Sequence, residues 1–374
     1  MGHLNHSKND VYHELAHRLE KNPAGAPLTP TLIQILKHLY GEREAEIGSK
    51  FPLMPCTFED LQKNTELPAE TLQDNLQEMS NRGLVIEFTQ NETTYYLLSP
   101  MVVGFFEYTF MRSNEHLPMQ ELASLFEQYL NEEGVPEEIF GGETKMFKAR
   151  AYDRLMPHEV ETEVLNYEKA SEMIRDAGGG ALSLCSCRHK ATLLGKNCDT
   201  PLEVCTSIGY AAEWLIARDL ARPAGVDELL RVLEHTEELG LVHLGDNVRK
   251  NPAYICHCCS CCCGVLRAIN EAGVNSVQPS NFIPYFDKEK CNGCGKCAER
   301  CPVDAIEIVE EVPGDKKSKQ ATLQEDRCLG CGVCIDGCRQ DAVWLSQRKD
   351  IYVPPKNKTE QLFRIAMEKG KILD

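Results

Sequence analysis

The feature that most constrains this chain is one cysteine spacing that occurs twice near its C-terminus. Two sets of four share the spacing C-x2-C-x2-C-x3-C: Cys291, Cys294, Cys297 and Cys301; and Cys328, Cys331, Cys334 and Cys338. This spacing is typical of short loops that surround a cubane iron–sulfur cluster. Zinc sites use pairs of ligands rather than four ligands at this spacing, so zinc or structural thiols are the weaker interpretation.

The ligands of the two clusters are expected to cross between the sets. The first three thiolates of a set lie on one tight loop, which cannot easily bend back to supply the fourth corner of a cube. We therefore expect each set to give its fourth cysteine to the other. The predicted ligands are Cys291, Cys294, Cys297 and Cys338 for one cluster, and Cys328, Cys331, Cys334 and Cys301 for the other. Four glycines would let the backbone approach the sulfurs: Gly293, Gly295, Gly330 and Gly332.

Length, charge and cysteine content limit the class of protein. The 374 residues suffice for two or three domains. A net charge of −17 disfavours nucleic acid and anionic membranes and suits docking to basic partner surfaces. No stretch reaches the roughly 18 apolar residues of a membrane span. All but Cys56 of the 19 cysteines lie between Cys185 and Cys338, which does not fit a secreted disulfide framework. We therefore expect a cytoplasmic protein of a reducing, anaerobic cell.

The first hundred residues have the pattern of a winged helix. Helices are predicted over 29–41, 57–65 and 68–83, followed by a hairpin with strands 84–88 and 94–98. The third helix would enter the major groove, yet it offers Glu70, Asp74 and Glu78 against Arg82 alone. A helix that reads DNA brings cations and amides to it, so a docking or dimerisation module is favoured over nucleic-acid binding. A further helical segment is predicted over 102–130.

Ten more cysteines lie upstream of the doubled spacing and predict at least one further metal centre. They are Cys185, Cys187, Cys198, Cys205, Cys256, Cys258, Cys259, Cys261, Cys262 and Cys263. Neighbouring side chains point apart, so only roughly four to six of the ten can be ligands of one centre. An iron–sulfur cluster is favoured and zinc is the alternative. Reduced structural thiols, or a redox dithiol of Cys258 with Cys261, are also open. Arg188 and His189 would either donate hydrogen bonds to a cluster or face solvent.

The secondary structure around these cysteines is predicted to be mostly helical. Helices are expected over 158–178, 201–221 and 226–241, with one short strand over 181–187. Residues 254–273 read as a cysteine-rich loop running into a helix, and residues 359–372 as a tail helix.

The last part of the chain resembles the bacterial-type two-cluster [4Fe-4S] ferredoxins. The resemblance rests on residues 291–306 and 328–343, with Arg339 where that family often has proline. The whole chain is similar to larger ferredoxin-type proteins of anaerobes that carry segments like 185–188, 201–205 and 256–263. The resemblance implies electron transfer through clusters and says little about a substrate.

These observations predict a multidomain α+β protein. The expected parts are a helical lead-in with a winged-helix-like domain (1–140), a mostly helical cysteine-rich domain (141–284), a two-[4Fe-4S] ferredoxin domain with a β-α-β pseudo-repeat (285–346) and a tail helix (347–374). The favoured function is that of an electron carrier, or the electron-transfer subunit of an anaerobic oxidoreductase, acting on redox partner proteins rather than as a catalyst alone. The alternatives are a redox-sensing regulator that acts through the winged helix, and a catalytic central centre.

Overall fold

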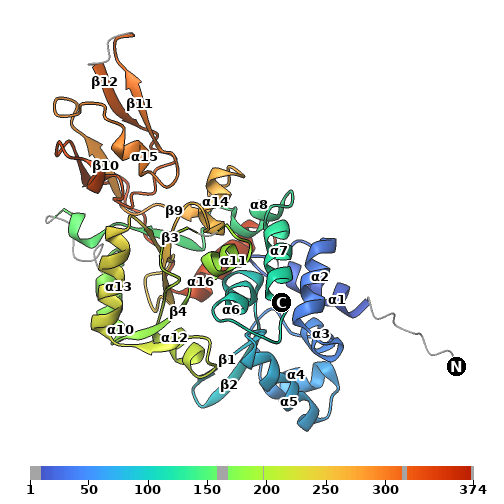
Figure 1. The fold of residues 1–374 in the computed structure, drawn as a ribbon. Helices are drawn as coiled ribbons and strands as arrows, with labels where there is room; N and C mark the ends of the chain where they lie inside the picture. The colour runs from blue at the N-terminus through green and yellow to red at the C-terminus, as the bar shows by residue number, and fades with distance from the viewer. Residues whose placement is uncertain (1–9, 158–166, 197, 314–317, 372–374) are drawn as a thin grey trace.

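The architecture comes from a computed structural model that describes residues 10–157, 167–196, 198–313 and 318–371. Figure 1 shows the N-terminal helices on one side of a central sheet, with the segment of β10 to β12 projecting away from them. The fold is mixed helix and sheet, as the sequence predicts.

Five helices and a hairpin form the N-terminal part. They are α1 (Asp10–Glu20), α2 (Pro30–Leu39), α3 (Glu42–Ser49), α4 (Phe58–Thr65), α5 (Ala69–Asn81), β1 (Val85–Gln90) and β2 (Thr93–Leu98). The helices begin at side-chain caps where the sequence offers them: Thr29 accepts the N–H of Leu32, and Thr57 accepts that of Asp60. The predicted helices and hairpin are present, and the winged-helix assignment stays a prediction.

The charges on α5 fit the argument against DNA. Glu70, Asp74 and Glu78 are all exposed. Arg82, at the end of the helix, donates to the backbone oxygen of Leu39 at 2.9 Å and forms an ion pair with Glu44. Arg82, the one cation of this helix that could contact DNA phosphates, is therefore already paired with groups of the protein itself.

The next segment is helical in two pieces. An irregular turn (Met101–Phe105) leads into the short helix α6 (Phe106–Phe110), and α7 (Met119–Leu130) and α8 (Val135–Phe140) follow. The helical segment predicted over 102–130 is thus present as α6 and α7, with a break between them. Gly104 lies in an extended conformation in the turn, and Pro118 caps the start of α7.

A seven-stranded sheet forms the centre of the molecule, in the order β6-β4-β5-β8-β7-β3-β9. Its strands are β3 (Phe147–Arg150), β4 (Gly180–Leu184), β5 (Glu203–Ile208), β6 (Arg222–Ala224), β7 (Val242–Asp246), β8 (Tyr254–Cys258) and β9 (Val277–Gln278). The prediction of a mostly helical central domain was wrong. Residues 201–221 form β5 and then α12 (Gly209–Ile216), because β-branched residues alternate along 204–208 and favour a strand.

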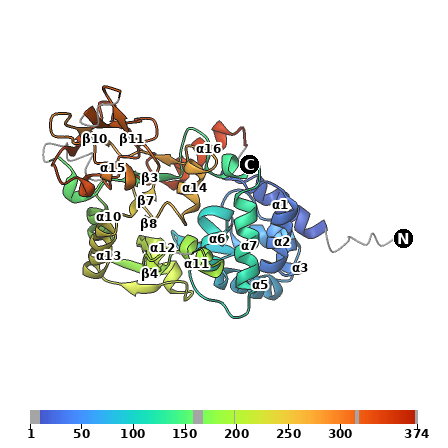
Figure 2. The same cartoon turned by 45° about the horizontal axis from the view of Figure 1, so that its top comes forward.

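Helices cover both faces of this sheet (Figure 2). α10 (Ala170–Ala177) and α13 (Val226–Glu238) pack with Leu182, Ile208 and Ile255 on one face. α11 (Ser186–Leu193) and α14 (Gly264–Asn270) lie on the other face of the sheet. Each of them begins directly after a cysteine, Cys185 and Cys263. The predicted helix over 158–178 is described only in its last part, as α10, and 158–166 lie outside the described residues. The helix over 226–241 is confirmed as α13.

The C-terminal part contains two small antiparallel sheets, β10 with β13 and β11 with β12. Its elements are β10 (Phe282–Phe286), α15 (Lys296–Glu299), β11 (Ile306–Glu310), β12 (Lys319–Leu323) and β13 (Val343–Gln347). The predicted tail helix is confirmed as α16 (Lys358–Glu368). None of the helices in the described residues is long and apolar enough to cross a membrane.

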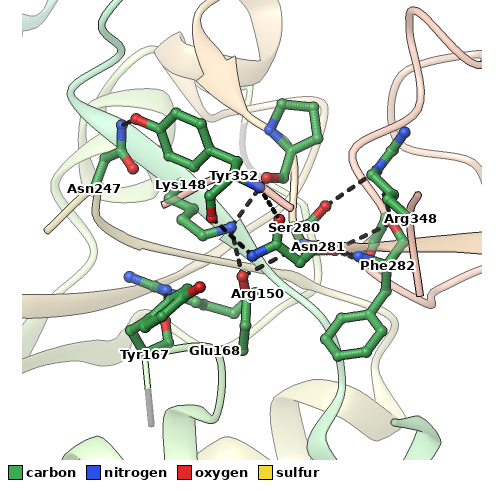
Figure 3. Close-up of polar contacts among 12 residues, drawn as sticks. Lys148, Arg150, Tyr167, Glu168, Asn247, Ser280, Asn281, Phe282, Arg348 and Tyr352 are labelled. Carbon is green, nitrogen blue, oxygen red and sulfur yellow. Dashed lines mark hydrogen bonds and ion pairs between the residues drawn. The ribbon is translucent and has the colours of Figure 1, made fainter. Parts of the chain in front are cut away.

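A buried polar network joins the C-terminal part to the central sheet (Figure 3). Lys148 of β3 and Glu168 form an ion pair at 2.8 Å, with both side chains fully buried. Lys148 also donates to the backbone oxygen of Pro279 at 3.0 Å, and Asn281 exchanges two hydrogen bonds with the backbone of Tyr352. The segment 279–281, which leads into β10, is therefore held against the central sheet by hydrogen bonds, one of them from the buried Lys148.

Candidate metal centres

The first cysteine loop of the doubled spacing lines a hollow near the surface. Its lining includes Cys291, Cys294, Cys297 and Cys338, together with Phe286, Ile308 and Val343. We call these four cysteines the outer set, since Cys294 is exposed and the other three are half-buried. The structure therefore brings Cys338, from the second spacing, to the loop of the first.

The second loop lies deeper in the molecule. Cys328, Cys331 and Cys334 are buried, and Cys301 lies near all three of their thiols. We call these four cysteines the inner set. Burial raises the pKa of Cys331 to about 12, so a thiolate here requires a bound cation to offset the loss of water. A metal cluster supplies that charge.

The backbone of both loops fits a cluster. The fourth cysteine of each spacing accepts an N–H bond from the residue four positions later: Ala305 donates to Cys301 at 3.2 Å, and Ala342 to Cys338 at 3.4 Å. All four loop glycines have positive φ, between 64° and 90°. A Cβ at Gly293 would lie 2.4 Å from the Cβ of Lys319. The loops therefore need glycine to fold tightly around their sulfurs.

The inner set is anchored to the central domain. Arg348 donates to the backbone oxygen of Cys328 at 2.9 Å, and the hydroxyl of Ser280 donates to that of Gly330 at 2.7 Å. The N–H of Tyr152, which follows β3, donates to the oxygen of Cys331 at 3.1 Å. The inner set thus faces the central sheet while the outer set faces solvent.

The ten upstream cysteines separate into two groups. Four of them have sulfurs within 4.8 Å of one another, and we call them the quartet: Cys198, Cys259, Cys261 and Cys262. Cys198 lies 3.7 Å from Cys259 and 3.9 Å from Cys262. One tetrahedral ion with metal–sulfur distances of about 2.3 Å places its sulfurs about 3.8 Å apart. The quartet therefore fits a single zinc or iron ion.

The other six form a separate group, which we call the six-thiol group: Cys205, Cys258 and Cys263 are buried, and Cys185, Cys187 and Cys256 are half-buried. Their thiols are near neighbours. Cys187 lies near Cys263, Cys258 lies near both Cys263 and Cys256, and Cys205 lies near Cys256. The thiols of Cys205 and Cys258 lower the pKa of Cys256 to about 5. The ten candidates of the predicted central centre thus fall into two sets with no shared member.

Arg188 lies between the two groups. It is fully buried and donates to the backbone oxygens of Pro201 and His257. Burial would lower its pKa, but the nearby cysteines, Cys185, Cys259 and Cys258, raise it above its usual range. His189 is also buried, with Nδ1 placed 2.8 Å from the backbone oxygen of Phe110. Neither of the two predicted donors faces solvent, and Arg188 lies near sulfurs of both groups.

A row of aromatic side chains runs from the inner set to β8, the strand that carries Cys256 and Cys258. The ring of Tyr152 lies 5.2 Å from that of His243, which lies 4.9 Å from that of His257. Burial lowers the pKa of His243 to about 3, so this histidine is neutral in the folded protein. His257 sits in β8 between Cys256 and Cys258. The sequence offered no sign of this row, since its members are far apart along the chain.

Comparison with known proteins identifies the C-terminal part. Residues 290–342 match the family of 4Fe-4S dicluster domains. This part of the chain is therefore a 4Fe-4S dicluster domain, and the resemblance seen in the sequence is confirmed.

A longer stretch matches one characterised enzyme. Over 98 residues, 25% of this chain, the sequence is 33% identical to coenzyme F420-dependent sulfite reductase of Methanocaldococcus jannaschii. The match covers 15% of that protein's length. No solved structure matches the chain.

Proposed function

We propose that this protein is an iron–sulfur electron-transfer protein with two [4Fe-4S] clusters in its dicluster domain. The outer cluster is held by Cys291, Cys294, Cys297 and Cys338, and the inner one by Cys328, Cys331, Cys334 and Cys301. The observation that carries this assignment is the position of the fourth cysteines: Cys338 lines the outer hollow, and Cys301 lies near the inner thiols. Such clusters, when bound, accept and release single electrons.

The arrangement supports a direction of transfer. The outer set faces solvent beside two exposed aromatic residues, Tyr285 and Trp344, whose rings lie 4.8 Å apart. A redox partner protein would dock there, because exposed aromatic side chains favour protein contacts. Electrons would then pass to the inner set and along Tyr152, His243 and His257 toward the central cysteines. The protein would serve as a cytoplasmic carrier or as a subunit of a larger anaerobic oxidoreductase.

The relative with a known activity fits this proposal without extending it to a substrate. That relative is named as a sulfite reductase that depends on coenzyme F420. An enzyme of that kind moves electrons, and the short matched stretch is consistent with a shared electron-transfer role. We propose no sulfite chemistry for this chain.

A single variant tests the proposed clusters. In anaerobically purified protein, Cys331→Ser is expected to remove about four irons, because the inner cluster loses a ligand that burial keeps out of reach of solvent. Iron and acid-labile sulfide are counted, and the reduced protein is examined by EPR. Cys56→Ser is the matched control, since this buried thiol is near Tyr96 and far from the other cysteines in sequence. Wild-type protein with zinc and no sulfide would contradict the proposal.

The regulator alternative predicts DNA binding, and we expect none. The exposed face of α5 is acidic, and Arg82 is held by Glu44 and Leu39. In mobility-shift titrations from 50 to 200 mM salt, duplex DNA should remain unbound whether the clusters are oxidised or reduced. A complex that weakens steeply as salt increases would revive the regulator hypothesis.

A further inference from the structure

The six-thiol group is built from three separate parts of the chain. The register of β5 and β8 pairs Thr206 with Ile255, which places Cys205 across from Cys256 on one face of the sheet. Cys258 lies on that same face, two residues further along β8. Cys185 caps the start of α11, and Cys263 caps the start of α14. The fold therefore places these thiols together on the face of the sheet that α11 and α14 cover.

Adjacent residues keep the six-thiol group and the quartet apart. Cys258 contributes to the six-thiol group and Cys259 to the quartet, while Cys262 contributes to the quartet and Cys263 to the six-thiol group. Neighbouring side chains point in different directions, so one loop can supply two sites. Consecutive Cα atoms are about 3.8 Å apart, which keeps the two sites close enough to act together.

The buried guanidinium of Arg188 points to bound, negatively charged sulfur beside it. Among the described residues no carboxylate forms an ion pair with it, and its Nε has no hydrogen-bond partner. A buried cation requires a nearby anion. The groups near enough to balance its charge are the sulfurs of Cys185, Cys258 and Cys259, which belong to the two sulfur sites and would carry negative charge as metal ligands.

The number and spacing of the sulfurs indicate more than one metal. One tetrahedral ion takes four ligands, and this group has six. In the described part of the chain, only the quartet brings three or more candidate ligand atoms within 4.8 Å of one another. The six-thiol group is thus more extended than a single-ion site, as are the two sets of the dicluster domain. Ligands bound to different irons of one cluster are spread in this way.

We propose that Cys185, Cys187, Cys205, Cys256, Cys258 and Cys263 bind a separate polynuclear iron–sulfur cluster, while the quartet holds a single metal ion. The central domain then contains two centres, and Arg188 lies between them. This proposal stands independently of the electron-transfer role, because it concerns what the sulfurs hold.

The test separates the two sites by metal and sulfide content. The full chain is purified without oxygen, and iron, zinc and acid-labile sulfide are counted for three proteins: wild type, a Cys205→Ser/Cys258→Ser variant and a Cys261→Ser/Cys262→Ser variant. The first variant should lose iron and sulfide together, with one set of Mössbauer signals, and keep the ion of the quartet. The second should lose one metal ion per chain and no sulfide. Cys331→Ser should leave the six-thiol signals unchanged.

A second measurement covers the case in which the first variant does not fold. Wild-type protein is treated with an alkylating reagent before and after iron is removed with a chelator, and the modified cysteines are mapped by mass spectrometry. Protection of Cys185, Cys187 and Cys256, which are only half-buried, should end when iron is removed. Wild-type sulfide that the dicluster domain fully accounts for would overturn the proposal. Alkylation of these cysteines before iron removal would do the same.

Discussion

Replacing Gly330 with alanine is expected to remove the inner cluster and about four irons from each chain. Gly330 has a φ of 66°, and a Cβ there would lie 2.1 Å from the backbone oxygen of Phe282 and 2.4 Å from the hydroxyl oxygen of Ser280. Neither atom can yield easily, since β10 begins at Phe282 and Ser280 is hydrogen-bonded to Gly330 itself. The loop must therefore move, and the sulfurs of Cys328 and Cys331 on either side move with it.

A second glycine isolates the steric effect from backbone strain. Gly273 has nearly the same φ, 68°, but nothing lies within 4 Å of the position its Cβ would occupy. Gly273→Ala should therefore show only the left-handed strain, about 1–2 kcal/mol, and keep all of its iron. Iron content, EPR of the reduced protein and the melting temperature are compared for both variants. Equal iron in both would show that the tight approach at Gly330 is not needed for the cluster.

The dicluster domain was the part most open to prediction from sequence. Its spacing is local, because three ligands and two glycines within seven residues define a loop whatever the rest of the chain does. The helices with clear caps were predictable for the same reason: Thr57 and Asp60 fix the start of α4 by contacts within one turn. Features whose partners lie within a few residues of one another can be predicted from the sequence.

The central sheet was missed because its strands are short and come from distant segments. β6 has three residues and β9 has two, so neither shows a period of its own. One signal was present: the alternation in residues 254–258, where Ile255 and His257 separate Tyr254, Cys256 and Cys258. If these residues had been predicted as a strand, Cys256 and Cys258 would have been placed on one face of it. That would have assigned these two cysteines to the same site.

The contacts that connect the centres could not be predicted at all. Tyr152, His243 and His257 come from three different strands or their ends, and only the order of strands brings the rings together. The same holds for Lys148 and Glu168, which are 20 positions apart and meet only when β3 is in the sheet. Such pairs depend on tertiary structure, and a single sequence does not reveal it.

Glu168→Gln is expected to destabilise the protein by about 3–5 kcal/mol, because Lys148 loses its counterion and must give up its proton to stay buried. Both side chains are fully buried, and Lys148 keeps only the backbone oxygen of Pro279 and the ring of Tyr352, 5.8 Å away, as described partners. The loss should lower the melting temperature at pH 7 by roughly 5–10 °C. Because Pro279 precedes the segment that holds the inner loop, protease cleavage near residues 279–282 should also become faster.

Two variants show whether the lost charge partner is the cause. Glu172→Gln breaks the exposed pair of Glu172 with Arg175 and should change stability by less than about 0.5 kcal/mol. Replacing both buried partners, in Lys148→Met/Glu168→Leu, should restore most of the stability, since no charge is then left unpaired. A double variant as unstable as Glu168→Gln would mean that packing, and not charge, is what the pair provides.

The destabilisation caused by Glu168→Gln should also depend on pH, with a definite sign. Burial lowers the pKa of Lys148 to about 8 in the wild type, where Glu168 opposes the shift. Without that carboxylate the pKa falls further, so the folded variant holds Lys148 neutral while the unfolded chain, with a lysine pKa of about 10.4, still binds the proton. The unfolded state then binds more protons, and stability rises with pH. The gap in melting temperature between the variant and the wild type should therefore shrink from pH 7 to pH 9.5. A gap that widens over this range would show that Lys148 stays charged in the folded variant.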